Sequence, residues 1–332
     1  MDKVCKHSDD IILETQDLCK YFKNKHGKSK ENVVRAVDKV SLQIRRGETL
    51  AVVGESGCGK STLGRTILHL YEPTSGKVIF EGKEIHKPSA AENKALRKKM
   101  QIVFQDPYAS LNPRMKVSDI LAEPIRFHEI AKGSTEIRKA VEKVMMQCGL
   151  PAYVADRYPH EFSGGQRQRI SIARALSVQP SFVVLDEPVS ALDVSIQSQI
   201  INLLQDLQEK QHLTYLFISH DLSVVHHIAN RVVVMYLGTV MELADKDDLY
   251  ENPAHPYTRA LLSAIPKDNP KEQKERIILN GEIPSPANPP SGCKFRTRCQ
   301  FATEACAAKE PALREVTPGH FVACDRYEDI HL

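Results

Sequence analysis

Eight consecutive residues, GESGCGKS at 54–61, have the types and spacing of a loop that binds phosphate. Its glycines let the backbone turn so that successive N–H groups point inward at phosphate oxygens. Lys60 supplies a cation for the β- and γ-phosphates, and the Ser61 hydroxyl can bind Mg²⁺. The alternative, a glycine-rich turn without a ligand, is disfavoured because an apolar run (TLAVV, 49–53) precedes the loop and a helix is expected from Ser61. The candidate nucleotide-binding residues here are Gly54, Glu55, Ser56, Gly57, Cys58, Gly59, Lys60, Ser61 and Thr62.

A second candidate for phosphate chemistry is the acidic pair in FVVLDEP (182–188). The apolar run predicts a strand that delivers Asp186 to the metal ion, directly or through water. Glu187 follows at the strand's end, where its carboxylate could orient and polarise an attacking water. Acidic pairs are also common on solvated surfaces, but the buried strand and the phosphate loop together favour a site.

Four of the eight cysteines crowd into residues 293–324, where SGCKFRTRCQFATEAC (291–306) is followed by Cys324. A metal site, an iron–sulfur cluster, a disulfide framework and unpaired thiols are all open. Five, six and seventeen residues separate successive cysteines. Zinc prefers closer pairs, so the spacing disfavours a zinc ribbon. Four thiolates on an irregular scaffold suit a [4Fe–4S] cluster better.

The elements expected to position these groups alternate along the chain. Short runs rich in Val, Ile and Phe predict buried strands at 49–54, 100–104, 182–188, 214–221 and 231–238. Helical patterns lie between them, as after Asp193, which indicates an α/β fold with a mainly parallel sheet. Residues 107–178 show helical patterns without a convincing strand and predict a helical insert. Antiparallel strands with glycine turns are expected within 33–48 and 76–85. Four prolines in 283–293 predict an extended linker.

Composition narrows the class of protein. Of 332 residues, 42% are hydrophobic and 26% charged, which is ordinary for a globular protein. The net charge of +3 is too small to argue for nucleic acid or anionic lipid. The N-terminus lacks the apolar core of a signal peptide, and no run approaches the length of a membrane span. We therefore expect the cytoplasm, where disulfides are rare.

The stretch EFSGGQRQRISIARAL (161–176), between the phosphate loop and the acidic strand, resembles the signature of ATP-binding-cassette (ABC) ATPases. Gln105 in VFQDP resembles the Q-loop, SALD (190–193) the D-loop, and His220 in ISHD the switch histidine. Phe22, beside Tyr21, occupies the position of an adenine-stacking aromatic. The resemblance covers residues 11 to about 330. Phe162 departs from the usual Leu, with little expected effect.

This resemblance implies a P-loop ATPase core with an antiparallel β subdomain and a helical subdomain, acting as one of two facing ATPase subunits. Glu187, His220 and Gln105 are then the catalytic candidates, and Asp186 and Phe22 join the loop in binding ATP and Mg²⁺. Gln105 would report the nucleotide to the helical insert, which grips membrane subunits in transporters. The partner's ATP would be capped in trans by Ser163, Gly164, Gly165, Gln166 and Asp193.

Longer phrases, FQDPYASLNPRM (104–115) and NPAHPYTRALLSAIP (252–266), resemble the F-type ATPase subunit of oligopeptide or dipeptide importers. That family implies a non-identical D-type ATPase, two permeases and an extracellular substrate-binding protein, with this chain peripheral at the cytoplasmic face of the plasma membrane. A nickel or metal-chelate importer is one alternative. A soluble ABC protein without a transport role is another.

The resemblance also bears on the cysteines, because peptide-importer ATPases with a similar tail hold a [4Fe–4S] cluster. It implies the ligands Cys293, Cys299, Cys306 and Cys324 in a small irregular Cys-rich C-terminal domain. We accordingly expect an ABC ATPase domain at 1–262, with its helical subdomain at about 107–178, and a C-terminal extension at 263–332.

Overall fold

The computed structural model describes residues 10–23, 33–265 and 276–330. They fall into two units: one takes in residues 45–49 and 86–218, the other 11–44, 50–85 and 219–332. The N-terminal residues 1–9, for which the sequence predicts no signal peptide, lie outside the described residues. So do residues 266–275, which follow the predicted domain boundary at 262.

Parallel strands form the sheet of the first unit, with β7 paired to β6 on one side and to β8 on the other. Their bounds are Met100–Val103 for β6, Phe182–Asp186 for β7 and Thr214–Ile218 for β8. Every residue of β7 and β8 is buried. Uninterrupted apolar runs are what parallel strands covered on both faces require, so these strands lie where the sequence predicted them.

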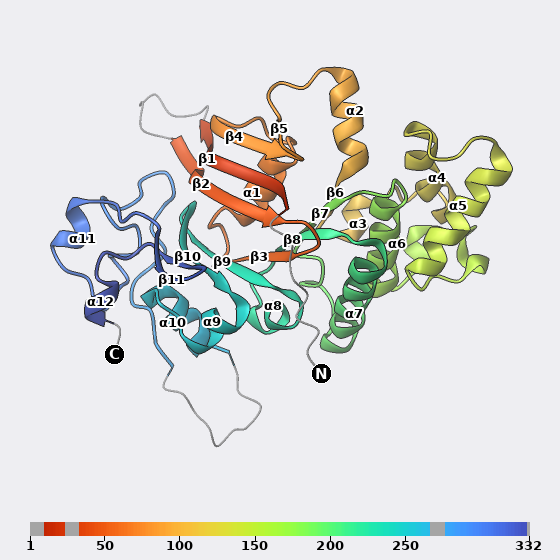
Figure 1. The fold of residues 1–332 in the computed structure, drawn as a ribbon. Coiled ribbons are helices and arrows are strands. Elements are labelled where there is room, and N and C mark those ends of the chain that lie inside the picture. Colours follow the sequence, from red (N-terminus) through yellow and green to blue (C-terminus); the bar gives the residue numbers. More distant parts are fainter. Residues whose placement is uncertain (1–9, 24–32, 266–275, 331–332) are drawn as a thin grey trace. The chain divides into compact units, whose positions relative to one another are not determined.

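Helices make up most of the rest of the first unit. The stretch of chain that connects β6 to β7 contains α4, α5 and α6, which pack against one another (Figure 1). No strand interrupts residues 104–181, all of which the structure describes. The helices are α2 (Ala90–Lys99), α3 (Pro107–Ser110), α4 (Val117–Phe127), α5 (Ser134–Gln147), α6 (Gly164–Leu176) and α7 (Val194–Gln211), with 3₁₀ turns at Ala152–Val154 and Pro159–Glu161.

The second unit contains an antiparallel sheet in the order β2-β1-β4-β5. Its strands are β1 (Ile11–Lys23), β2 (Val33–Arg45), β4 (Ser75–Phe80) and β5 (Lys83–Glu84). The predicted antiparallel strands are present, but β1 was missed. It pairs with β4 and lies between β2 and β4 in the sheet, so the two predicted segments are not direct neighbours.

A second sheet of this unit carries the C-terminal tail. Strand β3 (Thr49–Val53) runs parallel to β9 (Arg231–Tyr236), and β10 (Thr239–Asp245) is antiparallel to β9. Strand β12 (His320–Val322) of the tail pairs with β10, and β11 (Arg314–Thr317) pairs with β12. Strands β12 and β11 of the tail thus extend this sheet, and the predicted small irregular Cys-rich C-terminal domain is not confirmed.

Helices complete the described part of the second unit (Figure 1). They are α1 (Lys60–Ile67), α8 (Leu222–Ile228), α9 (Lys246–Glu251), α10 (Pro256–Ser263), α11 (Ala305–Ala308) and α12 (Tyr327–Ile330). Across the ranges that the structure describes, no helix is both long enough and apolar enough to span a membrane.

Candidate nucleotide site

The phosphate loop connects the buried strand β3 to helix α1, in the order that the sequence predicted. Two of its glycines are sterically obligatory. A Cβ on Gly54 would lie 2.2 Å from the Met235 carbonyl oxygen, and one on Gly59 would lie 1.9 Å from that of Ala36. Both have positive φ, +150° and +108°, which side chains rarely adopt. The loop therefore packs directly against neighbouring backbone.

Lys60 begins α1 and folds back over the loop. Its side chain is almost entirely buried, and Nζ donates to the carbonyl oxygens of Gly54 (2.8 Å) and Glu55 (3.1 Å). These bonds hold the cation against the backbone of the turn, where phosphate oxygens can compete for it. Burial raises the pKa of the neighbouring Cys58 thiol, which fits a small, protonated filler. Ser56 and Gly57 are exposed, while Ser61 and Thr62 are half-buried in the first turn of α1.

Phe22 lies at the end of β1 with 37% of its surface exposed. Its ring meets that of Tyr71 edge-on at a centroid distance of 5.5 Å, and Lys20 Nζ lies 5.1 Å from its centre. The adjacent Tyr21 instead donates a hydrogen bond from its hydroxyl to Asp38 (2.6 Å). Of the two aromatic residues, Phe22 is the one that presents a ring for stacking on a base.

His220 lies in a turn fixed by its neighbours. The Ser219 N–H donates to the Val52 carbonyl (3.1 Å), which ties this turn to the strand that enters the phosphate loop. Asp221 donates its N–H to Ser219 Oγ (3.0 Å) and caps helix α8 through bonds from Ser223 and Val224. The imidazole of His220 is exposed. The turn thus holds a histidine beside the loop's own strand.

In the first unit, β7 delivers the acidic pair. Asp186, its last residue, is 1% exposed, and Glu187 follows with a positive φ of 48°. Such a backbone conformation is uncommon outside glycine and often marks functional sites. Gln105 Nε2 donates to Glu187 Oε2 (3.0 Å), so the structure joins two residues that the sequence implicated separately. The amide orients the carboxylate.

The signature segment forms the N-terminus of α6. The Ser163 hydroxyl accepts from the Gln166 N–H, and Gln166 Oε1 accepts from the Ser163 N–H, a capping box. Ser163 and Gly164 are exposed. Gly165 is buried, and a Cβ there would lie 2.4 Å from Ile196 Cγ2. The glycine therefore permits close packing of α6 on α7 while the helix start remains accessible.

Asp193, the last D-loop residue, caps helix α7. Its carboxylate accepts from the Ile196 N–H (3.0 Å) and from the Ser195 hydroxyl (2.8 Å). The Ser195 bond is the main reason that the pKa of Asp193 is lowered. The side chain is exposed, so a role toward a second subunit remains compatible with the cap.

The prediction of a [4Fe–4S] cluster is wrong. Within residues 10–23, 33–265 and 276–330, no group of three or more His, Cys, Asp or Glu side chains is arranged to hold a metal ion. Cys293, Cys299, Cys306 and Cys324 are all free thiols. Burial raises the pKa of Cys293 to about 11 and also raises the pKa values of Cys299 and Cys324.

Charged side chains, instead of cysteines, attach this tail to its unit. Lys294 Nζ lies 2.8 Å from the Asp38 carboxylate, and both side chains are about 95% buried. His320 Nε2 lies 2.7 Å from the buried Glu242, which also accepts from the N–H groups of Ala254 and His255. The cysteine pattern does not predict these pairs, and nothing in the sequence indicates which residues would form them.

Two further residues contact the phosphate loop and were missed. Arg298, in the tail, donates two hydrogen bonds to the Glu55 carboxylate, and Tyr257, in α10, accepts from the Glu55 N–H. Both lie more than 190 residues from Glu55 along the chain. The only signal was the phrase NPAHPYTRALLSAIP, which marked α10 without assigning Tyr257 a contact.

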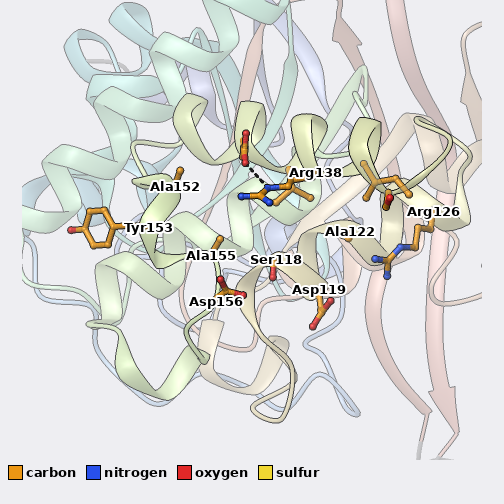
Figure 2. A pocket seen from close by; sticks show the side chains of 13 residues that line it. Ser118, Asp119, Ala122, Arg126, Arg138, Ala152, Tyr153, Ala155 and Asp156 are labelled. Atoms are coloured by element: carbon orange, nitrogen blue, oxygen red, sulfur yellow. Dashed lines mark hydrogen bonds and ion pairs between the residues drawn. The ribbon is translucent and has the colours of Figure 1, made fainter.

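A pocket of about 560 Å³ lies in the helical part of the first unit, lined by α4, α5 and the turn at 152–156 (Figure 2). Its wall mixes both charges: Asp119, Arg126 and Asp156 line it, as does the exposed pair of Arg138 and Glu142 (3.0 Å). None of the predicted nucleotide-site residues lines this pocket. It is a feature of the helical insert.

The chain resembles known proteins over nearly its whole length. Residues 37–190 match the ABC transporter family, and residues 241–306 match the oligopeptide/dipeptide transporter C-terminal region. It is 54% identical to the oligopeptide transport ATP-binding protein AppF of Bacillus subtilis, with 96% of this chain and 98% of that protein covered. It is 50% identical to OppF of Haemophilus influenzae, a protein of the same description, with 95% and 97% covered.

Solved structures are similar over the ATPase core. The ATP-binding cassette MJ0796, in a dimeric post-hydrolysis state bound to ADP and Pi, is 29% identical with a TM-score of 0.63 and covers 70% of this chain and 98% of its own. A subunit of a Clostridium perfringens ABC transporter complex, cbiO1, is 29% identical with a TM-score of 0.64, covering 74% and 92%.

Proposed function

The chain belongs to the ABC transporter family, among the ATP-binding proteins of oligopeptide and dipeptide transport, and on this premise we propose that it hydrolyses ATP to power import of peptides. The observation that carries the proposal is the match beyond the cassette. Residues 241–306 correspond to the C-terminal region of oligopeptide/dipeptide transporters, and relatives of that description are similar end to end. The separate cassette match accounts for the ATPase.

The phosphate loop fits a nucleoside triphosphate and Mg²⁺. Its backbone approaches Met235 and Ala36 so closely that only glycine is accommodated at positions 54 and 59, and the N–H groups of such glycine-rich turns are suited to phosphate oxygens. We assign the β- and γ-phosphates to Lys60 and the metal to oxygen ligands from Ser61 and Asp186, the donors that Mg²⁺ prefers. Bound Mg²⁺ neutralises charge on the phosphates.

Hydrolysis needs a group that prepares water for attack on the γ-phosphate, and Glu187 has this role in our proposal. Its carboxylate, held by the amide of Gln105, can accept a proton from water or orient it. Gln105 at the same time links Glu187 to the segment that enters the helical insert. His220, exposed in a turn tied to the strand of the phosphate loop, is assigned a contact with the γ-phosphate.

We further propose that a second ATPase subunit completes each nucleotide site. The accessible N-terminus of α6 presents Ser163 and backbone N–H groups, which suit an anionic phosphate. Gly164, Gly165, Gln166 and Asp193 complete the surface assigned to the partner's ATP. We infer a non-identical D-type ATPase as this partner.

The remaining partners follow from the family. An importer ATPase acts on permeases, and we propose two of them, fed by an extracellular substrate-binding protein, with this chain bound at the cytoplasmic face of the plasma membrane. The helical insert is the part that we assign to permease contact. Residues 263–332 are proposed as the extension that distinguishes peptide importers, although β12 joins them to the sheet of the core.

Substitution Glu187→Gln tests the hydrolytic role. The amide retains the size and a hydrogen-bonding oxygen but cannot accept a proton, so we expect turnover to fall by about 100-fold or more while ATP binding persists. Phosphate release by the purified ATPase pair measures turnover, and nucleotide retained after gel filtration measures binding. The matched control is Glu209→Gln, a carboxylate on the exposed side of α7. Unaltered turnover in Glu187→Gln would refute the assignment.

A further inference from the structure

Two side chains from the C-terminal part of the chain hold one residue of the phosphate loop. The Arg298 guanidinium donates to both oxygens of the Glu55 carboxylate, at 2.6 and 3.1 Å. The Tyr257 hydroxyl accepts from the Glu55 N–H at 2.9 Å. The Arg298 side chain is 7% exposed and that of Glu55 24% exposed, so this is a largely enclosed, bidentate ion pair. Such pairs are directional and stronger than surface contacts.

Arg298 is itself fixed by its surroundings. The backbone N–H of Arg298 donates to the Phe295 carbonyl (3.0 Å). The Phe295 ring is buried against the rings of Tyr236 and Tyr257, whose centroids lie 5.4 and 5.2 Å away. The guanidinium carbon lies 6.0 Å from the centre of the Tyr236 ring. Lys294, four residues earlier, is anchored to Asp38. The guanidinium therefore reaches Glu55 from a rigid support.

Glu55 occupies a sensitive place in the loop. Its carbonyl and that of Gly54 both accept hydrogen bonds from Lys60 Nζ, so fixing Glu55 also helps to fix where the Lys60 ammonium lies. In addition, Glu55 brings a negative charge to a loop that receives a polyanion. Arg298 neutralises this charge at short range, where Coulomb interactions are large.

We propose that Arg298 and Tyr257 form a clamp that positions the phosphate loop and neutralises Glu55, so that the C-terminal region sets the affinity for ATP. Both are positioning residues that act through Glu55 and need not touch the nucleotide. The inference rests on ATP binding at this loop, as proposed above. It gives the C-terminal region a function in the ATPase itself.

The clamp is tested by titrating the purified full-length chain with a fluorescent ATP analogue. We expect Arg298→Ala to weaken binding about tenfold, because a bare carboxylate then faces the triphosphate. The affinity of Arg298→Lys for the analogue should lie between those of the unaltered chain and Arg298→Ala, since an ammonium neutralises the charge but cannot form the paired bonds. Tyr257→Phe, which removes only the hydroxyl, should weaken binding about threefold. Arg296→Ala and Tyr250→Phe are matched controls away from Glu55, with changes below twofold expected.

The decisive variant adds Glu55→Gln to Arg298→Ala. If Arg298 acts by neutralising and placing Glu55, the double variant recovers at least half of the lost affinity on a logarithmic scale. A merely structural Arg298 predicts no recovery, and that result overturns the proposal, as does wild-type affinity in Arg298→Ala. If the unaltered chain itself fails to bind the analogue, the proposed ATPase function fails instead. Thermal unfolding of each variant verifies that it is folded.

Discussion

The phosphate loop and the cysteine-bearing tail both present residue types that suggest a bound group, yet only the loop has a geometry that supports one. In the loop, contiguous residues are enough: glycines at 54 and 59 fit where no Cβ can, and Lys60 folds back on its own turn. Whether the four tail cysteines come together depends on how a Pro-rich segment folds against strands that are distant in sequence. A ligand set that is local in sequence is therefore easier to infer than one assembled by tertiary contacts.

The tail differs from the loop in a second way, because its structural role is carried by residues between the cysteines. Lys294 and Arg298 make ion pairs with Asp38 and Glu55, while Cys293 and Cys299 on either side of them are free thiols. If this contrast holds, the loop should respond strongly to small backbone changes, and the tail should tolerate the loss of a thiol better than the loss of a charge.

The largest effect is expected from Gly59→Ala, with Gly57→Ala as its matched control. A Cβ on Gly59 meets the Ala36 carbonyl, so the loop must move, and we expect a loss of about 3 kcal/mol or more in stability together with at least 100-fold weaker ATP binding. Gly57 also has positive φ, but a Cβ there would meet no atom within 4 Å, so strain alone costs about 1 kcal/mol. Chemical denaturation measures both losses of stability. Equal losses would show that the close approach at Gly59 is not decisive.

An intermediate effect is expected from His255, the residue that caps α10. Burial lowers the pKa of its imidazole to about 4. Its unfolded pKa is about 6.5, so the unfolded chain binds an extra proton between these values, and stability falls as pH decreases from about 6.5 to 4. The loss from this group reaches up to about 3 kcal/mol at pH 4. His255→Asn retains a side-chain acceptor for capping α10 but cannot titrate.

The difference between wild type and His255→Asn isolates this contribution, because other groups titrate in both proteins. We expect the variant's free energy of unfolding to depend less steeply on pH between 4.5 and 6.5, measured by urea denaturation at each pH. The buried Glu242, which accepts from the His255 N–H, is unchanged in both. If the free energies of unfolding of the two proteins depended on pH equally steeply, burial would not lower the pKa of His255 in the folded state.

The smallest effect is expected from Cys299→Ser. The thiol is half-buried, forms no disulfide and belongs to no metal-binding group among the residues that the structure describes. Exchange of sulfur for oxygen should change stability by less than about 1 kcal/mol and ATPase activity by less than twofold. Arg298→Ala, one position earlier, is the comparison that should have the larger effect. Proteolytic release of the tail in Cys299→Ser alone would reverse this contrast.

Much of the fold was predictable because local patterns determine it. The apolar runs of β3, β6, β7, β8 and β9 are largely buried on both faces, so they stand out as uninterrupted hydrophobic segments. Strand β1 was missed because exposed polar residues interrupt its buried positions. The bond between Gln105 and Glu187 was not predictable either, since 82 residues separate them and only the fold brings them together.

The contacts of Arg298 with Glu55 were not predicted and the iron–sulfur cluster was predicted wrongly for the same reason, because both depend on tertiary packing. Arg298 lies 243 residues from Glu55, and no periodicity or spacing relates two such positions. The spacing of the cysteines, conversely, resembled that of a ligand set without containing any information on the directions of their side chains. Tertiary packing decides both, through the aromatic rings of Tyr236, Tyr257 and Phe295 and through the pairing of β12 with β10.

Uptake of a labelled oligopeptide by vesicles that contain the whole transporter tests most directly whether ATP bound by this chain powers peptide import. The comparison is between the unaltered chain and Lys60→Ala, which removes the cation from the phosphate loop. We predict that ATP supplied on the side of this chain drives uptake with the unaltered chain and that Lys60→Ala lowers the rate at least 100-fold. Undiminished peptide uptake with Lys60→Ala would contradict this account.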